Sequence, residues 1–160
     1  MLILNTGGTF NKRYDMIAGE LQVPVDNFAV ERILESFDVK PAVAGVVYKD
    51  SLEMTLQDRK MITDIIFHSQ EREFVIVHGT DTMDVTAEFL DSVFDVRLIV
   101  LTGAMKPFEI DRVEASLNLG LAIGFARAQQ QNGVYICMNG HIRPWSEISK
   151  NKAAGKFEVE

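Results

Sequence analysis

The sequence has only one cysteine among its 160 residues and no cluster of lysines and arginines. Because a single thiol cannot form an internal disulfide, we expect Cys137, which lies in the apolar run 134–138, to be a buried core thiol. The 23 acidic residues outnumber the 16 basic residues and give a formal net charge of −7. Since this charge repels a polyanion, we expect no nucleic acid as a partner.

Long apolar stretches are absent as well. The longest candidate, residues 117–128, is interrupted by Asn118, two glycines and Arg127, whereas a membrane-spanning helix needs about 20 predominantly apolar residues. An apolar run follows Met1 directly and leaves no room for a secretory signal. We therefore expect a soluble, cytoplasmic protein that has no membrane partner.

The sequence also lacks the spacings typical of metal sites and of serine hydrolases. His68, His78 and His141 are scattered among different predicted elements, so we expect no metal and no other cofactor. No Gly-x-Ser-x-Gly sequence occurs, and a Ser-His-Asp apparatus therefore has no support. We expect His78 to be a mostly buried histidine with satisfied hydrogen bonds, and Lys106 to be a structural or surface residue.

What the chain does contain is an alternation of strand-like and helix-like stretches. Apolar blocks predict strands near residues 1–5, 42–48, 73–78, 97–102 and 133–138. Helical spacing predicts helices at about residues 30–37, 56–67, 85–93 and 111–130. Thr55, with Asp58 three positions later, is typical of a helix N-cap. The strands lack a clean period of two, which favours a parallel sheet buried on both faces. We predict one α/β domain over residues 1–160, a three-layer sandwich with a mainly parallel, Rossmann-like or flavodoxin-like sheet.

Three segments stand apart from this pattern. Residues 10–25 form a polar stretch that is longer than most connections from strand to helix and could be a lid. Residues 155–160 are expected to be a frayed tail. Gly120 and Gly124 allow another helix to come close to the last predicted helix. That approach can occur inside the fold or between subunits, and the sequence leaves both possibilities open.

Two threonines follow predicted strands in matching settings. Thr9 ends the motif Thr6-Gly7-Gly8-Thr9, and Thr80 lies in His78-Gly79-Thr80-Asp81-Thr82. The carboxyl ends of parallel strands lie at one edge of the sheet, where ligands bind in open α/β folds. The same edge is expected to carry further polar loops, which contain Ser51, Ala104 and Lys150. The sequence therefore predicts a ligand site built on hydroxyls, a carboxylate and an amine.

The ordered pair of motifs resembles the two signature motifs of bacterial-type L-asparaginases. Residues 101–107 and a lysine after the fifth predicted strand also fit the amino-terminal domain of that family. The resemblance covers nearly the whole chain. It implies a short, single-domain asparaginase that lacks the smaller carboxy-terminal domain of the family.

The resemblance also implies catalytic roles for individual residues. Thr9 would attack the side-chain amide carbon to give a β-aspartyl ester, and Tyr14 would help to activate it. Thr80, Asp81 and Lys150 would form a second catalytic group, in which Lys150 lowers the cost of taking a proton from Thr80. For this role Lys150 has to be partly desolvated and paired with Asp81.

Free asparagine carries an ammonium and a carboxylate, so its site needs a holder for each charge. Asp81 fits the ammonium, whereas Ser51 and the backbone N–H groups near Gly8 and Gly79 fit the carboxylate. Thr80 lies between Gly79 and Asp81 and is therefore also expected to bind the substrate. By resemblance, the carbonyl of Ala104 would face the leaving amide nitrogen.

One residue departs from the family pattern: Leu52 stands where many members have a glutamine. This exchange removes a hydrogen-bond partner of the substrate and predicts weak affinity. With the second domain absent, a neighbouring copy would have to close the site, and we therefore predict a homodimer.

The predicted function is hydrolysis of L-asparagine to L-aspartate and ammonia. One alternative is a catalytically weak module that binds or senses an amino acid, and another is an amidase that acts on a larger amide. Taken singly, Ser51, Thr80 and Asp81 are better explained as turn or N-cap residues before helices. Their occurrence together, in the order of the two motifs, favours the catalytic site.

Overall fold

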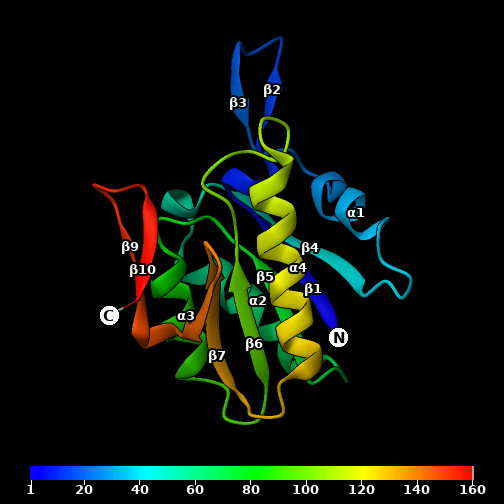
Figure 1. The fold of residues 1–160 in the computed structure, drawn as a ribbon, viewed down its shortest axis with the longest axis vertical. Coiled ribbons are helices and arrows are strands. Elements are labelled where there is room, and N and C mark those ends of the chain that lie inside the picture. Colours follow the sequence, from blue (N-terminus) through cyan, green and yellow to red (C-terminus); the bar gives the residue numbers. More distant parts are fainter. Residues whose placement is uncertain (160) are drawn as a thin grey trace.

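A central sheet lies between two layers of helices in the computed structural model, which describes residues 1–159 (Figure 1). The strands of the sheet are β1 (Leu2–Gly7), β4 (Ala42–Lys49), β5 (Glu73–Val77), β6 (Leu98–Thr102), β7 (Gly133–Met138) and β8 (His141–Pro144). The helices are α1 (Phe28–Leu34), α2 (Leu56–His68), α3 (Met83–Asp91) and α4 (Arg112–Ala128). Within the described residues, no helix is long and apolar enough to cross a membrane. The predicted three-layer α/β architecture is confirmed.

The strand order is β4-β1-β5-β6-β7-β8, in which the first five strands run parallel and β8 pairs antiparallel with β7. From β1 the chain crosses to β4 on one side and then returns to β5 on the other side of β1. This is the flavodoxin-like order, and it places a topological switch between β1 and β5. Ligands bind outside the carboxyl ends of the strands at such a switch. Thr9 and Thr80 follow these two strands.

Alternate residues of each buried strand face opposite layers of helices. Ile3 and Val75 pack with α1 and α4 in one apolar cluster, whereas Leu4 and Phe74 pack with α2 and α3 in a second cluster. Burial on both faces explains why the strands show no clean period of two. Cys137 is fully buried in the first cluster, as predicted, and burial raises the pKa of its thiol to about 12.

Local interactions set the ends of the helices. The Thr55 hydroxyl accepts the Asp58 N–H at 3.2 Å, and the Asp58 carboxylate accepts the Thr55 N–H at 2.8 Å, so the N-cap predicted for α2 is a complete capping box. α1 ends at Leu34, before the predicted end at Phe37. The Phe37 N–H donates to the Leu34 carbonyl at 3.0 Å, which is the tighter three-residue spacing of a 3₁₀ turn.

Residues 10–25 are ordered rather than an open loop. The 3₁₀ helix η1 (Thr9–Asn11) leads into β2 (Arg13–Asp15) and β3 (Glu20–Gln22), which pair antiparallel and project beyond the end of the sheet (Figure 1). Residues 139–150, which we expected to form a loop, also contain regular structure. They comprise β8, the 3₁₀ helix η3 (Trp145–Glu147) and most of β9 (Ile148–Asn151).

The prediction of a frayed tail is wrong for residues 155–159, and Glu160 lies outside the described residues. Residues Lys156–Val159 form β10, which pairs antiparallel with β9. Phe157 is buried and packs with Ile148 in the second apolar cluster. Phe157 therefore anchors the last strand to the body of the protein.

Candidate active site

The two motif loops meet through their glycines. Gly8 has a φ of 72°, and a Cβ atom on it would lie 2.5 Å from the backbone of Gly79. A Cβ atom on Gly79 would in turn lie 2.6 Å from the Cβ of Ser51. Glycine alone permits these approaches. The loops that follow β1, β4 and β5 therefore form one continuous surface at the carboxyl edge of the sheet.

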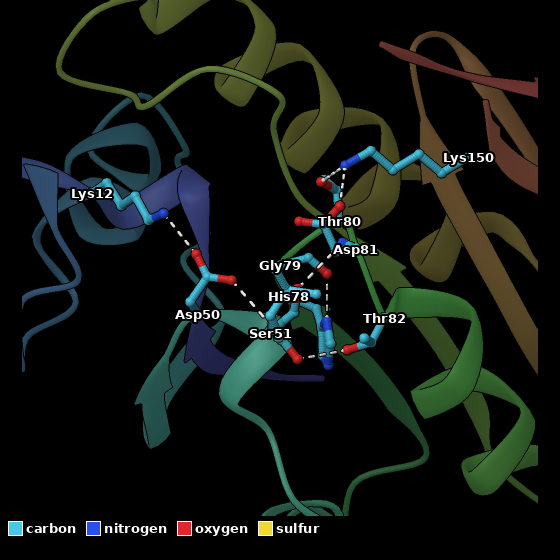
Figure 2. Close-up of polar contacts among 10 residues, drawn as sticks. Lys12, Asp50, Ser51, His78, Gly79, Thr80, Asp81, Thr82 and Lys150 are labelled. Atoms are coloured by element: carbon cyan, nitrogen blue, oxygen red, sulfur yellow. Dashed lines mark hydrogen bonds and ion pairs between the residues drawn. The ribbon is translucent and has the colours of Figure 1, made fainter. Parts of the chain in front are cut away.

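Lys150 joins Thr80 and Asp81 on this surface (Figure 2). Its ammonium group donates to the Thr80 hydroxyl at 2.8 Å and to the Asp81 carboxylate at 2.8 Å. The Lys150 side chain is only 14% exposed, and Thr80 is buried. The structure thus brings together the three residues that the sequence assigns to one group, and it desolvates the lysine in part.

The hairpin of β9 and β10 holds Lys150 in place. Lys150 lies opposite Phe157 in the pairing of the two strands, and Phe157 anchors the hairpin in the apolar core. The Phe157 N–H also donates to the Asn139 side chain at 3.0 Å, which ties the hairpin to the end of β7. The tail therefore supports the site. The alternation of Lys156, Phe157 and Glu158 is the sequence signal that indicates this strand.

A buried chain of hydrogen bonds supports the Thr80 loop from beneath. Arg59 Nε donates to the Thr86 hydroxyl at 2.9 Å, and that hydroxyl lies 2.9 Å from His78 Nε2. His78 Nδ1 lies 2.7 Å from the Gly79 carbonyl. With these partners the Thr86 hydroxyl donates to Nε2, and the Nδ1–H group donates to Gly79. Burial, helped by the charge of Arg59, lowers the pKa of His78 to about 4, so the ring is neutral at pH 7.

Thr9 begins η1, and a pair of buried amides fixes this turn. Asn11 donates to the side chain of Asn5 at 2.9 Å and to the Gly7 carbonyl at 2.6 Å, and Asn5 donates back to Asn11 at 3.1 Å. The Thr9 carbonyl accepts the Lys12 N–H at 3.1 Å. Within residues 1–159 every buried side-chain nitrogen or oxygen has a partner, whereas the Thr9 hydroxyl has none. This hydroxyl is therefore not fully buried, in line with the intermediate burial of Thr9.

Tyr14 lies on β2 of the projecting hairpin, where its side chain is 58% exposed. Its backbone N–H donates to Glu109 at 2.8 Å. Among the described residues, no hydrogen bond joins its hydroxyl to Thr9. The structure therefore does not bring these two residues together.

Ser51 braces the second motif from the neighbouring loop. Its hydroxyl accepts the Asp81 N–H at 3.2 Å, and its carbonyl accepts the Thr82 hydroxyl at 2.8 Å (Figure 2). Ser51 is almost fully buried as the first residue of the 3₁₀ helix η2 (Ser51–Glu53). The N-cap positions of η2 and α3 belong to Asp50 and Thr82. Ser51 and Asp81 are therefore not N-caps, although Thr80 and Asp81 do lie in the turn that precedes α3, as the alternative interpretation allowed.

A second lysine–aspartate pair, which no sequence motif indicated, lies on the other side of Ser51 (Figure 2). Lys12 Nζ lies 2.6 Å from the Asp50 carboxylate, which also accepts the Leu52 N–H at 3.2 Å. Burial opposes ionisation of Asp50, but these two hydrogen bonds and the charges of Lys12 and Lys150 lower its pKa. Leu52 is 70% exposed. It lines a groove of about 480 Å³ together with Lys12, Asp50 and the β3 hairpin strand.

Ala104 completes the edge of the site after β6. It is fully buried, and the carbonyl of the preceding Gly103 accepts the side-chain amide of Asn118 at 2.9 Å. Within residues 1–159, no group of three or more His, Cys, Asp or Glu side chains is arranged to hold a metal ion. The polar groups that the site offers are hydroxyls, two lysine–aspartate pairs and backbone amides.

Comparison with known proteins connects this arrangement to one family. The family profile described as "Asparaginase, N-terminal" matches residues 1–156. L-asparaginase 2 of Escherichia coli is 30% identical over 161 residues, which cover 92% of this chain and 45% of that protein. The thermostable L-asparaginase from Thermococcus kodakarensis has the same fold, with a TM-score of 0.85 and 24% identity over 99% of this chain and 50% of that chain.

A second kind of relative is also similar. One component of the glutamyl-tRNA(Gln) amidotransferase of Methanococcus vannielii is 30% identical over 147 residues, which cover 88% of this chain and 34% of that protein. The chain thus spans half or less of the length of the curated relatives that it matches.

Proposed function

Because the chain belongs to the asparaginase family, whose amino-terminal domain it matches over residues 1–156, we propose that it hydrolyses the side-chain amide of L-asparagine to L-aspartate and ammonia. The observation that carries this proposal is the Lys150 ammonium, which bonds both Thr80 and Asp81 at 2.8 Å on the surface that also holds Thr9. A binding module needs holders for the charges of its ligand. It has no chemical need for a hydroxyl that is hydrogen-bonded to a partly desolvated lysine.

In this proposal Thr9 is the nucleophile. Its oxygen attacks the side-chain amide carbon, the C–N bond breaks, and the Thr9 proton leaves with the nitrogen as ammonia. Water then hydrolyses the ester, releases aspartate and restores the hydroxyl. A threonine hydroxyl is a weak nucleophile and needs a base or a hydrogen-bond relay. Tyr14 would supply that relay after the hairpin of β2 and β3 moves toward Thr9.

The group around Lys150 serves the proton transfers. A positive charge 2.8 Å from the Thr80 oxygen stabilises negative charge that develops there when Thr80 gives up its proton. Asp81 binds Lys150 through Oδ1, which leaves Oδ2 to accept the substrate ammonium. Backbone N–H groups near Gly8 and Gly79 and the Ser51 hydroxyl would receive the carboxylate, and the Ala104 carbonyl would face the leaving nitrogen.

The test is ammonia release from L-asparagine over a wide concentration range, with Thr9→Ala as the decisive variant. We expect saturable release that Thr9→Ala abolishes. Thr63→Ala is the matched control, because its hydroxyl bonds the Lys60 carbonyl within α2, away from the site. A folded wild-type protein that releases no ammonia from asparagine, or a Thr9→Ala variant with full activity, would reject the proposal.

A larger amide is the second candidate substrate. The groove beside Asp50 is lined by apolar Leu21 and Leu52 and could hold a group attached to the asparagine. The similarity to a component of an amidotransferase points in the same direction, although the net charge of −7 disfavours RNA as the carrier. Release of ammonia from asparagine-containing peptides at a higher kcat/KM than from free asparagine would favour this candidate.

A further inference from the structure

Among residues 1–159, Arg59 is the only buried lysine or arginine, with an exposed fraction of 7%. Its backbone N–H donates to the Thr55 carbonyl at 3.2 Å, so the capping box at the start of α2 fixes its place. No carboxylate of these residues pairs with its guanidinium group, because the neighbouring Asp58 pairs with Lys49 at 2.9 Å. A buried charge without a counter-charge costs folding free energy. The reason for a charge at this position therefore has to be sought in the groups that it contacts.

The three guanidinium nitrogens contact groups that belong or lead to two loops of the candidate site. Nη1 donates to the Met54 carbonyl at 3.2 Å, directly after η2, which begins at Ser51. Nη2 donates to the Thr82 hydroxyl at 3.2 Å, and Nε donates to the Thr86 hydroxyl at 2.9 Å. The guanidinium fork thus bridges the loop that follows β4 and the segment that follows β5.

The fork also sets the direction of the hydrogen bonds beyond it, because arginine has donors and no acceptor. The Thr82 hydroxyl accepts from Arg59 and is left to donate to the Ser51 carbonyl at 2.8 Å (Figure 2). In the same way, the Thr86 hydroxyl accepts from Arg59 and donates to Nε2 of His78 at 2.9 Å. Neither chain of hydrogen bonds can run in reverse while the guanidinium group is present.

The second chain fixes the peptide bond between Gly79 and Thr80. With Nε2 accepting, His78 carries its proton on Nδ1, which lies 2.7 Å from the Gly79 carbonyl. The peptide is trans, so its N–H, which belongs to Thr80, points away from this carbonyl and from the histidine. It is one of the N–H groups near Gly79 that would receive the substrate carboxylate. The orientation of this peptide therefore affects both the Thr80 N–H and the Thr80 hydroxyl beside Lys150.

We infer that Arg59 is a positioning residue of the active site, an inference that rests on the proposed function. Its planar fork holds the Ser51 loop and the Thr80 loop at one separation, which keeps the Asp81 N–H 3.2 Å from the Ser51 hydroxyl. Arg59 lies beneath the site and acts through the two threonine hydroxyls and the buried histidine. A lysine carries its donors on a single atom and cannot reproduce the fork.

The test is kcat/KM for asparagine. Arg59→Met removes the fork, and we expect kcat/KM to fall about 10²-fold, because small displacements of the groups around the substrate cost this much. Both a lower kcat and a higher KM are expected, since the Thr80 hydroxyl and its N–H shift together. Arg59→Lys keeps the charge but loses the fork and should be similarly slow. Lys60→Met removes a charge from the next, exposed position of α2 and should leave kcat/KM unchanged. Wild-type kcat/KM in Arg59→Met or in Arg59→Lys would overturn the inference.

Two further variants separate positioning from stability. Ile66→Ala removes a fully buried side chain near the other end of α2 and destabilises the protein, but the folded fraction should keep the wild-type kcat/KM. An equal loss of kcat/KM in Ile66→Ala and Arg59→Met, at equal stability in urea, would make Arg59 merely structural. Thr82→Val breaks one arm of the fork at a half-buried position. It should lower kcat/KM several-fold, and it decides the question if Arg59→Met does not fold; an unchanged kcat/KM would overturn the inference.

NMR spectra of the backbone amides distinguish failure of this inference from failure of the proposed function. The Thr80 amide signal should move in Arg59→Met and stay in place in Lys60→Met. Because Thr86 and His78 lie between Arg59 and the Gly79 carbonyl, such a shift reports a reoriented peptide. A wild-type protein that releases no ammonia would reject the proposed function alone. An unmoved Thr80 signal in Arg59→Met would overturn the role of Arg59 alone.

Discussion

Thr80 and Thr9 follow neighbouring strands and face the same edge of the sheet, yet their surroundings differ. The Thr80 hydroxyl is buried and receives the Lys150 ammonium at 2.8 Å. The Thr9 hydroxyl belongs to a half-buried residue, is not fully buried, and has no hydrogen-bond partner among the described residues. One half of the site is thus assembled in the free protein. In the proposed mechanism, the half that contains Thr9 still needs an activating group such as Tyr14.

The difference between the Thr80 loop and the Thr9 loop follows from the hairpin that lies next to each of them. Buried networks support both loops from beneath, through His78 for one and Asn5 for the other. Above Thr80, the hairpin of β9 and β10 is fixed to the core by Phe157. The hairpin of β2 and β3 carries Tyr14, and its strands have three residues each with no buried side chain. Elements with few buried contacts open and move at low free-energy cost.

The largest expected effect comes from removing the lysine of the assembled half. Lys150→Met keeps the length of the side chain but removes the charge beside Thr80. Since electrostatic and proton-transfer contributions of this kind are worth about 10²- to 10⁴-fold in rate, we expect kcat/KM for asparagine to fall by roughly 10³-fold. Lys152→Met, on the exposed turn of the same hairpin, is the control. Equal activity of Lys150→Met and Lys152→Met would show that Lys150 takes no part in the reaction.

The anchor of that hairpin is expected to link stability to activity. Phe157→Ala leaves a cavity under β10, and such substitutions cost about 3–5 kcal/mol of unfolding free energy. Because the same change loosens Lys150, kcat should fall even in the fully folded protein. Urea unfolding and steady-state kinetics separate the two effects. Val159→Ala, at an exposed position of β10, should change neither. A stable Phe157→Ala variant with normal kcat would mean that the hairpin does not position Lys150.

The buried histidine beneath Thr80 predicts a pH dependence of stability. The folded pKa of His78 is about 4 and its ordinary value is 6.5, so between these values the unfolded chain binds the proton and the folded chain does not. Stability is therefore retained above pH 6.5 and falls as the pH drops toward 4, by on the order of 3 kcal/mol. In His78→Gln this slope should be absent. His68→Gln, at an exposed position, should retain the slope. If His78→Gln lost stability with falling pH as steeply as the wild type, His78 would not be the cause of the pH dependence.

The smallest expected effect concerns Lys12, next to the half that contains Thr9. Its ammonium can donate three hydrogen bonds, and Asp50 takes one of them. A substrate carboxylate held near Ser51 would meet the others. Lys12→Met should therefore raise KM several-fold and leave kcat almost unchanged, because a partly exposed charge contributes only about 1 kcal/mol. Lys106→Met, which breaks a more exposed pair with Asp111, serves as the control. An unchanged KM in Lys12→Met would place the carboxylate elsewhere.

The sequence predicted the parts of the fold that repeat at short range. Periodicity located the five parallel strands and four helices, and the two motifs located the loops that carry Thr9 and Thr80. The pairing of β9 with β10 and the support of Lys150 by Phe157 were missed. The alternation of Lys156, Phe157 and Glu158 indicates a strand, but its partner strand and its contacts with the core depend on the packed structure. The sequence also could not show that Gly120 and Gly124 lie beside open space, where an added Cβ atom would meet no other atom within 4 Å.

Identification of the acylated residue shows directly which of the two threonines is the nucleophile. Wild-type protein turning over asparagine is quenched in acid and digested with trypsin, which separates Thr9 in residues 1–12 from Thr80 in residues 73–97. We expect an aspartyl adduct on the peptide 1–12 that is absent from Thr9→Ala. An adduct on the peptide 73–97 would make the preassembled Thr80 the nucleophile and would contradict the assignment of roles to the two threonines.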